Sequence, residues 1–247
     1  MRKLLTAIMA LSMILTLTTP VMAETTPKAE ETLSHLPDER GMGVDVSVMT
    51  GSGRIATISD GENERFSDLD PDAWYAEAVD YALERGLMNG VGDHRFAPND
   101  TTTRAMIVTI LWSLEGRPVV DYQMKFEDVA QDSWYTEAVR WAASKGIVTG
   151  YRDTVFAPND PITREQLAAI LYSFERSKGG GFTGAWMFRL DYTDIADISQ
   201  WSFEPVCWMT MKNIMSGKAG GILDPKGAAT RAEATQMLMR YLLSRES

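Results

Sequence analysis

The sequence predicts an all-α protein built from three tandem helix-loop-helix repeats, and three observations support this fold class. Trp74-Tyr75 recurs as Trp134-Tyr135, and the five residues 96–100 recur unchanged as 156–160. A Thr-Arg pair occurs in all three copies, each time at the start of a segment whose apolar residues follow the helical period. Repetition at a fixed period is typical of small helical units that bury their apolar faces only against neighbouring units.

Each copy begins with a predicted helix and continues into a loop. In the second copy Trp134, Ala138, Trp141 and Ala142 fall on one face of a helix, and Gly146 is placed to end it. Residues 150–160 then form a loop that contains proline and asparagine. We expect the three units to stack, because one such hairpin is too small to cover its own apolar face.

A second helix follows the Thr-Arg pair of each copy. Thr163 and Thr230 have Gln or Glu three residues later, the spacing of a capping box, whereas Thr103 has Met106 there. The apolar residues of the second copy share one helical face, and the other copies match them. The three sets are Leu167, Ile170, Leu171 and Phe174; Ile107, Ile110, Leu111 and Leu114; and Ala234, Met237, Leu238 and Tyr241.

The repeats fill most of the chain beyond an N-terminal extension. We place them at 64–117, 124–176 and 192–243, with a glycine-rich connector over 177–191 between the second and the third.

The N-terminal extension has two parts. Residues 1–23 have the pattern of a secretory signal peptide, with a positive start, an apolar run and small residues before a cut after Ala23. Residues 24–63 form an acidic leader, in which alternating apolar residues between Val44 and Ile58 flank a Gly-Ser-Gly turn and predict a β-hairpin.

Composition excludes several classes of function. The formal net charge is −10, which disfavours binding to nucleic acid or to an anionic membrane surface. One cysteine, Cys207, excludes an internal disulfide, and the two histidines have no partner at metal-ligand spacing. We therefore expect no metal and no cofactor, and no membrane span once the signal peptide is removed. Both a buried, inert thiol and an exposed one that cross-links chains stay open for Cys207.

The combined motifs are more specific than any one of them. The pattern Phe-x-Asp, Trp-Tyr, Ala-Val, Gly-Ile-Val-x-Gly, Phe-x-Pro and Thr-Arg-x-Glu, which recurs with departures in three copies over 64–243, resembles that of the S-layer homology (SLH) family. The resemblance implies a pseudo-threefold helical bundle whose grooves bind secondary cell-wall polysaccharide, often through terminal pyruvylated sugars. It also implies a non-enzymatic protein that is secreted and attached to the bacterial cell wall or cell surface.

The resemblance further implies ligand-binding roles for the arginine of each Thr-Arg pair, the tryptophan of each first helix and the glycine before each loop. These residues are Arg104, Arg164 and Arg231; Trp74, Trp134 and Trp201; and Gly90, Gly150 and Gly217. A guanidinium can hold the carboxylate of a pyruvate ketal with two hydrogen bonds, and unpaired N–H groups in the first turn of a helix favour an anion. An aromatic face suits a sugar ring, and glycine lets the backbone approach closely.

The tryptophan and arginine roles each have a structural alternative. The tryptophans can belong to the core, and the arginines can form salt bridges between repeats. Asp68, Asp128 and Asp194 follow an aromatic residue in each copy, and we expect them to cap the first turn of a helix. The second copy reads Thr-Arg-Glu-Gln and the first Thr-Arg-Ala-Met, which predicts that the three grooves differ.

Two other functions stay open at this point. The segment 44–58 can bind a protein partner by pairing with the edge of its sheet. A wall glycosidase is the enzymatic alternative, but it needs two opposed carboxylates in a cleft, and the acids here recur with the repeat as structural groups do.

Overall fold

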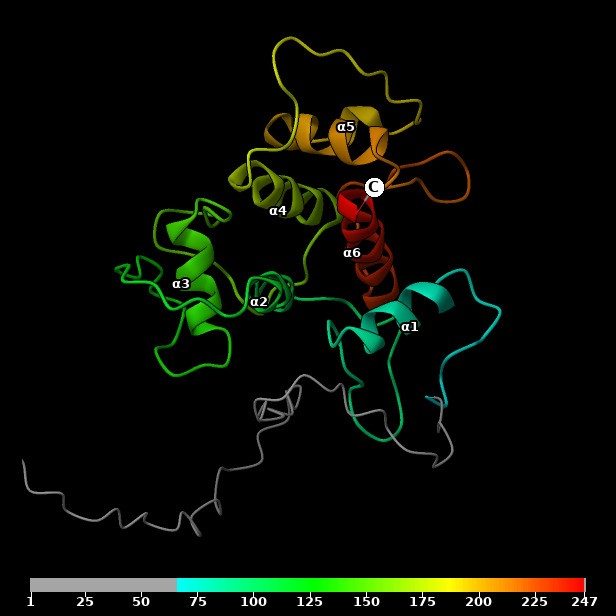
Figure 1. Ribbon diagram of the computed structural model, residues 1–247. Helices are drawn as coiled ribbons and strands as arrows, with labels where there is room; N and C mark the ends of the chain where they lie inside the picture. The colour runs from blue at the N-terminus through cyan, green and yellow to red at the C-terminus, as the bar shows by residue number, and fades with distance from the viewer. Residues whose placement is uncertain (1–65, 247) are drawn as a thin grey trace, which may run out of the picture. The chain divides into compact units, whose positions relative to one another are not determined.

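The structure is a computed structural model that describes residues 66–246 (Figure 1). The predicted signal peptide and the predicted hairpin over 44–58 lie outside these residues. The described part is helical: it contains isolated β-bridges but no strand, which confirms the predicted fold class. Its elements are α1 (Ala76–Glu84), α2 (Arg104–Leu114), α3 (Thr136–Ser144), α4 (Arg164–Ser177), η1 (Ile195–Asp197), η2 (Gln200–Ser202), α5 (Phe203–Met211) and α6 (Arg231–Glu246).

The main helix pairs are formed between repeats and not within them. α2 packs on α3, α4 packs on α5, and α6 packs on α1, as can be followed in Figure 1. The second helix of each repeat therefore covers the first helix of the next, and the third repeat returns to the first. This closed ring confirms the pseudo-threefold arrangement, and it differs from a linear stack of hairpins because no repeat is left with an uncovered end.

Three backbone hydrogen bonds close the ring at its centre. Thr102 N–H donates to Ala229 O at 3.0 Å, Ala229 N–H to Ile162 O at 2.8 Å, and Ile162 N–H to Thr102 O at 2.8 Å. All three residues are fully buried, and each comes directly before the threonine that caps its helix. Buried backbone groups need partners, so each repeat depends on both of the others here.

The predicted helix faces form the core. The apolar sets of α2, α4 and α6 are buried, apart from the half-buried Leu114. Ala138, Trp141 and Ala142 are buried on α3, but the placement of Trp134 with them is wrong, because it precedes the helix and is 43% exposed. Cys207 is buried on α5, and burial raises the pKa of its thiol to about 11, as expected for the inert alternative. No helix between residues 66 and 246 is long and apolar enough to cross a membrane.

Candidate functional site

Three grooves lie between the repeats, and every repeat contributes to each of them. The arginine of a Thr-Arg pair comes from one repeat, the loop and second helix come from the next, and an exposed tryptophan comes from the third. Groove 1 holds Arg104, Gly150 and Trp201; groove 2 holds Arg164, Gly217 and Trp74; and groove 3 holds Arg231 and Trp134. Of the predicted site residues, Gly90 alone is absent from these linings.

The grooves differ in size, as the sequence predicts. Their cavities measure about 460, 430 and 70 Å³ for grooves 1, 2 and 3. Ligand sites usually offer about 300 Å³ or more, so grooves 1 and 2 are large enough for a sugar unit and groove 3 is not. Trp74, Trp201 and Trp134 are 63%, 58% and 43% exposed, so the alternative that they belong to the core is wrong.

The Nε atom of each arginine binds the loop of the next repeat. Each donates to a backbone carbonyl in a buried contact: Arg104 to Phe156 at 2.8 Å, Arg164 to Leu223 at 3.0 Å and Arg231 to Phe96 at 2.8 Å. The Nη2 atoms of Arg164 and Arg231 hold further carbonyls, of Ser216 and Asn89. The arginines therefore connect repeats through carbonyl groups in all three copies, and Arg164 also forms the salt bridge between repeats that was the structural alternative.

Arg104 differs from Arg164 in its charge partners. Both residues are buried, with 6% of Arg104 exposed, but Arg104 forms no salt bridge with any residue that the structure describes, whereas Arg164 pairs with Glu233. The guanidinium carbon lies 4.5 Å from the ring centre of Tyr151 and 4.7 Å from that of Phe156. Burial lowers the pKa of Arg104, and Tyr151 and nearby aspartates only partly oppose this shift. A buried cation without a carboxylate is costly, and an anion in the groove would supply the missing partner.

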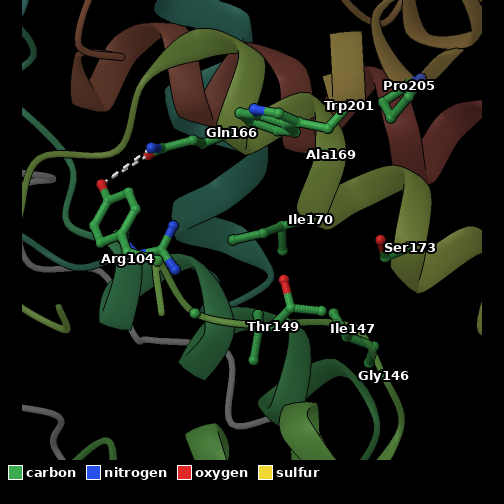
Figure 2. Close-up of a pocket in the computed structure, with 13 residues that line it drawn as sticks. Arg104, Gly146, Ile147, Thr149, Gln166, Ala169, Ile170, Ser173, Trp201 and Pro205 are labelled. Carbon is green, nitrogen blue, oxygen red and sulfur yellow. Dashed lines mark hydrogen bonds between the residues drawn. The ribbon is translucent and has the colours of Figure 1, made fainter. Parts of the chain in front are cut away.

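Figure 2 shows how groove 1 surrounds this guanidinium. Trp201 lies on one side of the cavity and Thr149 on the other, with Arg104 toward one end and Ile170 between them. Gln166 reaches toward the Arg104 end, where its Nε2 donates to the hydroxyl of Tyr151 at 3.0 Å, and this pair is joined by the dashed line. The site thus combines one cation with aromatic faces and polar groups.

Sequence reasoning missed Tyr151 because the three copies differ at this position. Lys218 occupies it in groove 2 and Val91 in the first repeat. A comparison of the residue directly after each loop glycine would have found it, since this residue enters the cavity of grooves 1 and 2.

The expectation that free N–H groups at the helix start also bind the anion is wrong. In α2 the N–H of Arg104 donates to Asp160 O at 3.1 Å and that of Ala105 to Pro158 O at 2.9 Å, while Met106 N–H binds the cap Thr103. The first turns of α4 and α6 are filled in the same way. Carbonyl groups of the neighbouring loop accept these hydrogen bonds, so the N–H groups are not available to a ligand.

The glycines have a packing role. A Cβ added at Gly150 would lie 2.6 Å from the ring of Phe126 and 2.6 Å from Val155 O. The ring of Phe66 occupies the matching space at Gly90, and Tyr192 does so at Gly217. Room for an aromatic ring of the same repeat explains glycine here without close approach of a ligand.

The three recurring aspartates have a structural role, as expected, but the prediction that they cap the first turn of a helix is wrong. Asp128 accepts hydrogen bonds from the N–H groups of Phe156 at 2.9 Å and Ala157 at 2.6 Å, so it clamps the loop and not a helix turn. Asp68 and Asp194 hold the matching loops. Burial raises the pKa of Asp194, but its backbone hydrogen bonds outweigh this effect, and the net pKa is lowered.

Groove 2 contains an internal ion-pair network. Glu233 lies 3.4 Å from Nη1 of Arg164 and 3.0 Å from Nζ of Lys218, and Lys218 also reaches Asp224 at 2.7 Å. Gln166 takes the place of Glu233 in groove 1, so the network has no counterpart there. The arginine of groove 2 already faces a carboxylate, whereas that of groove 1 does not.

Known proteins share these repeats. The sequence profile of the S-layer homology domain matches residues 65–105, 125–168 and 191–235, more than half of the chain. The exoglucanase XynX of Acetivibrio thermocellus is 30% identical over 72% of this chain and 16% of its own length. An S-layer protein of Bacillus thuringiensis subsp. finitimus is 27% identical over 71% and 21%, and a cellulosome-anchoring protein of A. thermocellus is 30% identical over 57% and 31%. The chain thus spans less than a third of each of these relatives.

Proposed function

Because the chain belongs to the S-layer homology domain family, we propose that it is an exported module that anchors to the bacterial cell surface by binding wall polysaccharide non-covalently. Relatives named as S-layer and cellulosome-anchoring proteins support this role and this location. The ligand group is a carboxylate, such as that of a pyruvate ketal on a sugar of the polysaccharide.

The observation that carries the proposal is the state of Arg104. Its charge is buried at the edge of a cavity of about 460 Å³, its Nε is held by Phe156 O, and no carboxylate of the described residues forms a salt bridge with it. The remaining donors of a guanidinium form a planar pair that matches a carboxylate. Trp201 supplies an aromatic face for the apolar side of the same sugar. Groove 1 is therefore the main carboxylate site.

The grooves support binding and not hydrolysis. A glycosidase of the usual kind needs two carboxylates on opposite sides of the scissile bond. Among the described residues, the linings of grooves 1 to 3 contain one carboxylate, Glu233, which is already paired with Arg164 and Lys218. The relative named as an exoglucanase matches over only 16% of its length, so the shared segment is a small part of that protein.

Co-sedimentation with isolated cell walls tests the proposal. We expect the full chain to bind intact walls and to lose binding when the polysaccharide is removed. Trp201→Ala should weaken binding about tenfold, because groove 1 loses the exposed aromatic face that covers the sugar ring. Trp134→Ala is the matched control, since this tryptophan is the threefold equivalent in the small groove 3. Its binding should equal that of the unchanged protein.

Two results would contradict the proposal. Binding that survives removal of the polysaccharide would favour a protein partner, such as one that pairs with 44–58. Equal loss in Trp201→Ala and Trp134→Ala, with unchanged melting temperatures, would show that groove 1 is not the main site.

A further inference from the structure

Groove 2 extends further along the protein surface than groove 1. A second, open cavity of about 690 Å³ adjoins it, and the two share Ser216 and Arg240 in their linings. The second cavity continues along the end of α5 and the last turns of α6, where Lys212 and Leu243 line it. The shared residues make one continuous surface from Trp74 in groove 2 to Lys212.

This continuous surface has more cations in its lining than groove 1 or groove 3. At the helix position of Arg240, groove 1 has Ser173 and groove 3 has Ser113. After the loop glycine, groove 2 has Lys218 where groove 1 has Tyr151. With Arg164 and Lys212, four cations line the joined cavities, whereas Glu233 is the one carboxylate in these linings and Asp224 pairs with Lys218 from outside them. Arg240 and Lys212 have no carboxylate partner among the described residues. In a chain with a net charge of −10, such a local excess of cations attracts anionic groups.

Arg240 is held at the junction of the two cavities. Its Nη1 donates to the hydroxyl of Ser216 at 3.2 Å. With the amide of Gln236 oriented by its partners, the amide oxygen accepts from Nε of Arg240 at 2.9 Å and the amide nitrogen donates to Trp74 O at 3.2 Å. The guanidinium is thus positioned relative to the tryptophan of groove 2, and it forms no salt bridge with a described residue.

We infer that groove 2 and the adjoining cavity form one extended site for a stretch of acidic polysaccharide that carries anionic groups on two successive sugar units. Lys218 and Arg164 receive the first anionic group, and Arg240 and Lys212 receive the second. Groove 1, with Arg104 as the one cation in its lining, takes a single anionic unit. This inference rests on the proposed function, because it assumes that the ligand is an acidic wall polysaccharide.

The first anion must compete with Glu233. The carboxylate of Glu233 lies against both Arg164 and Lys218, and 13% of its side chain is exposed. A ligand with one carboxylate gains little by replacing an equivalent internal partner. A ligand with a second anionic group gains the contacts to Arg240 and Lys212, which no internal carboxylate offsets. Groove 2 therefore discriminates between singly and doubly charged ligands, and groove 1 does not.

Groove-specific binding can be measured on the full chain by NMR titration of the indole N–H signals of Trp74 and Trp201, which report on grooves 2 and 1. The probes are two synthetic methyl disaccharides, one with a pyruvate ketal on each ring and one with a ketal on the terminal ring only. At Trp74 we expect the doubly charged probe to bind about tenfold more tightly, as for one added charge-assisted hydrogen bond. At Trp201 the two probes should bind within about a factor of two.

Variants test whether the residues of the second cavity cause the preference at Trp74. Lys212→Ala and Arg240→Ala should remove the preference at Trp74 and leave the titration at Trp201 unchanged, which also shows that the protein is folded. Lys145→Ala is the matched control, because it is the counterpart of Lys212 in the second repeat and lines none of these cavities. It should keep the preference.

The outcomes distinguish this inference from the proposed function. Equal affinities of the two probes at Trp74, or a preference that survives both Lys212→Ala and Arg240→Ala, would overturn the extended site. If Trp201 still responds to both probes, the proposed function stands. If neither indole responds to either probe, both are wrong.

Discussion

Arg231→Ala tests how strongly the ring of repeats depends on its arginines. Arg231 connects the third repeat to the first across most of the described chain, and it is 2% exposed. Its Nε donates to Phe96 O at 2.8 Å and its Nη2 to Asn89 O at 2.6 Å. The guanidinium carbon also lies 4.5 Å from the centre of the Phe96 ring. The alanine variant leaves both carbonyls without their charged donor.

The expected loss of stability follows from these two contacts. A hydrogen bond to a charged group contributes about 1.5–3 kcal/mol, so the free energy of unfolding should fall by at least about 3 kcal/mol. For a domain of this size the melting temperature falls by about 2–4 °C per kcal/mol, which gives a decrease of about 6–12 °C. For Arg104→Ala the free energy of unfolding should fall by about half as much, because only one such bond is lost. The variant also removes a buried charge that has no carboxylate partner, which further limits the loss.

Urea unfolding followed by near-ultraviolet circular dichroism measures both variants against the unchanged protein. Arg152→Ala, an exposed arginine outside the grooves, is the control and should unfold with the unchanged midpoint. Equal destabilisation by Arg231→Ala and Arg104→Ala, or no destabilisation by Arg231→Ala, would refute the reasoning that the carbonyl contacts hold the ring closed.

Three further predictions follow from the packing. Removal of residues 192–247 takes away α5 and α6, so the remaining repeats should lose their near-ultraviolet signal; a sharp melting transition would contradict this. The lowered pKa of Asp194 means that its stabilisation is present above about pH 4 and is lost as pH falls through the native pKa. Asp194→Asn should therefore shift the urea midpoint at pH 7, and the shift should shrink as the pH falls below about 4. A shift that does not change with pH would argue against the clamp. The thiol of Cys207, buried and with its pKa raised to about 11, should react with a maleimide at pH 8 only as fast as the protein unfolds, and reaction at the rate of free cysteine would show exposure.

The helices that follow the Thr-Arg pairs could be predicted closely, because propensity, capping and apolar spacing agree there. Their starts at Arg104, Arg164 and Arg231 come directly after the predicted caps. Thr103 shows the limit of the capping rule: the sulfur of Met106 accepts its N–H at 3.4 Å, in place of the expected polar partner. The first helices were less well predicted, since the apolar period continues through the turn that contains Trp134.

The pairing between repeats could not be derived from spacing within one repeat. A hairpin whose two helices pack on each other and a hairpin whose helices pack on neighbouring repeats have the same periodicity. The two arrangements can be distinguished only in the three-dimensional structure. For the same reason, spacing within one repeat could not show that Arg104 and Trp201 of the third repeat line the same groove, or that the carbonyls of Asp160 and Pro158 occupy the helix start. Sites assembled from three repeats depend on long-range geometry.

The most direct test of the central claim is a calorimetric comparison of the unchanged protein and Arg104→Lys, each with purified wall polysaccharide before and after removal of its pyruvate ketals. Lysine keeps the charge but lacks the planar pair of donors. Removal of the ketals should weaken binding at groove 1 of the unchanged protein about tenfold or more. The loss in Arg104→Lys should be clearly smaller, because only groove 2 and the point charge of the lysine still respond to the ketals. The same loss in both proteins would contradict the claim that Arg104 in groove 1 holds a carboxylate of the polysaccharide.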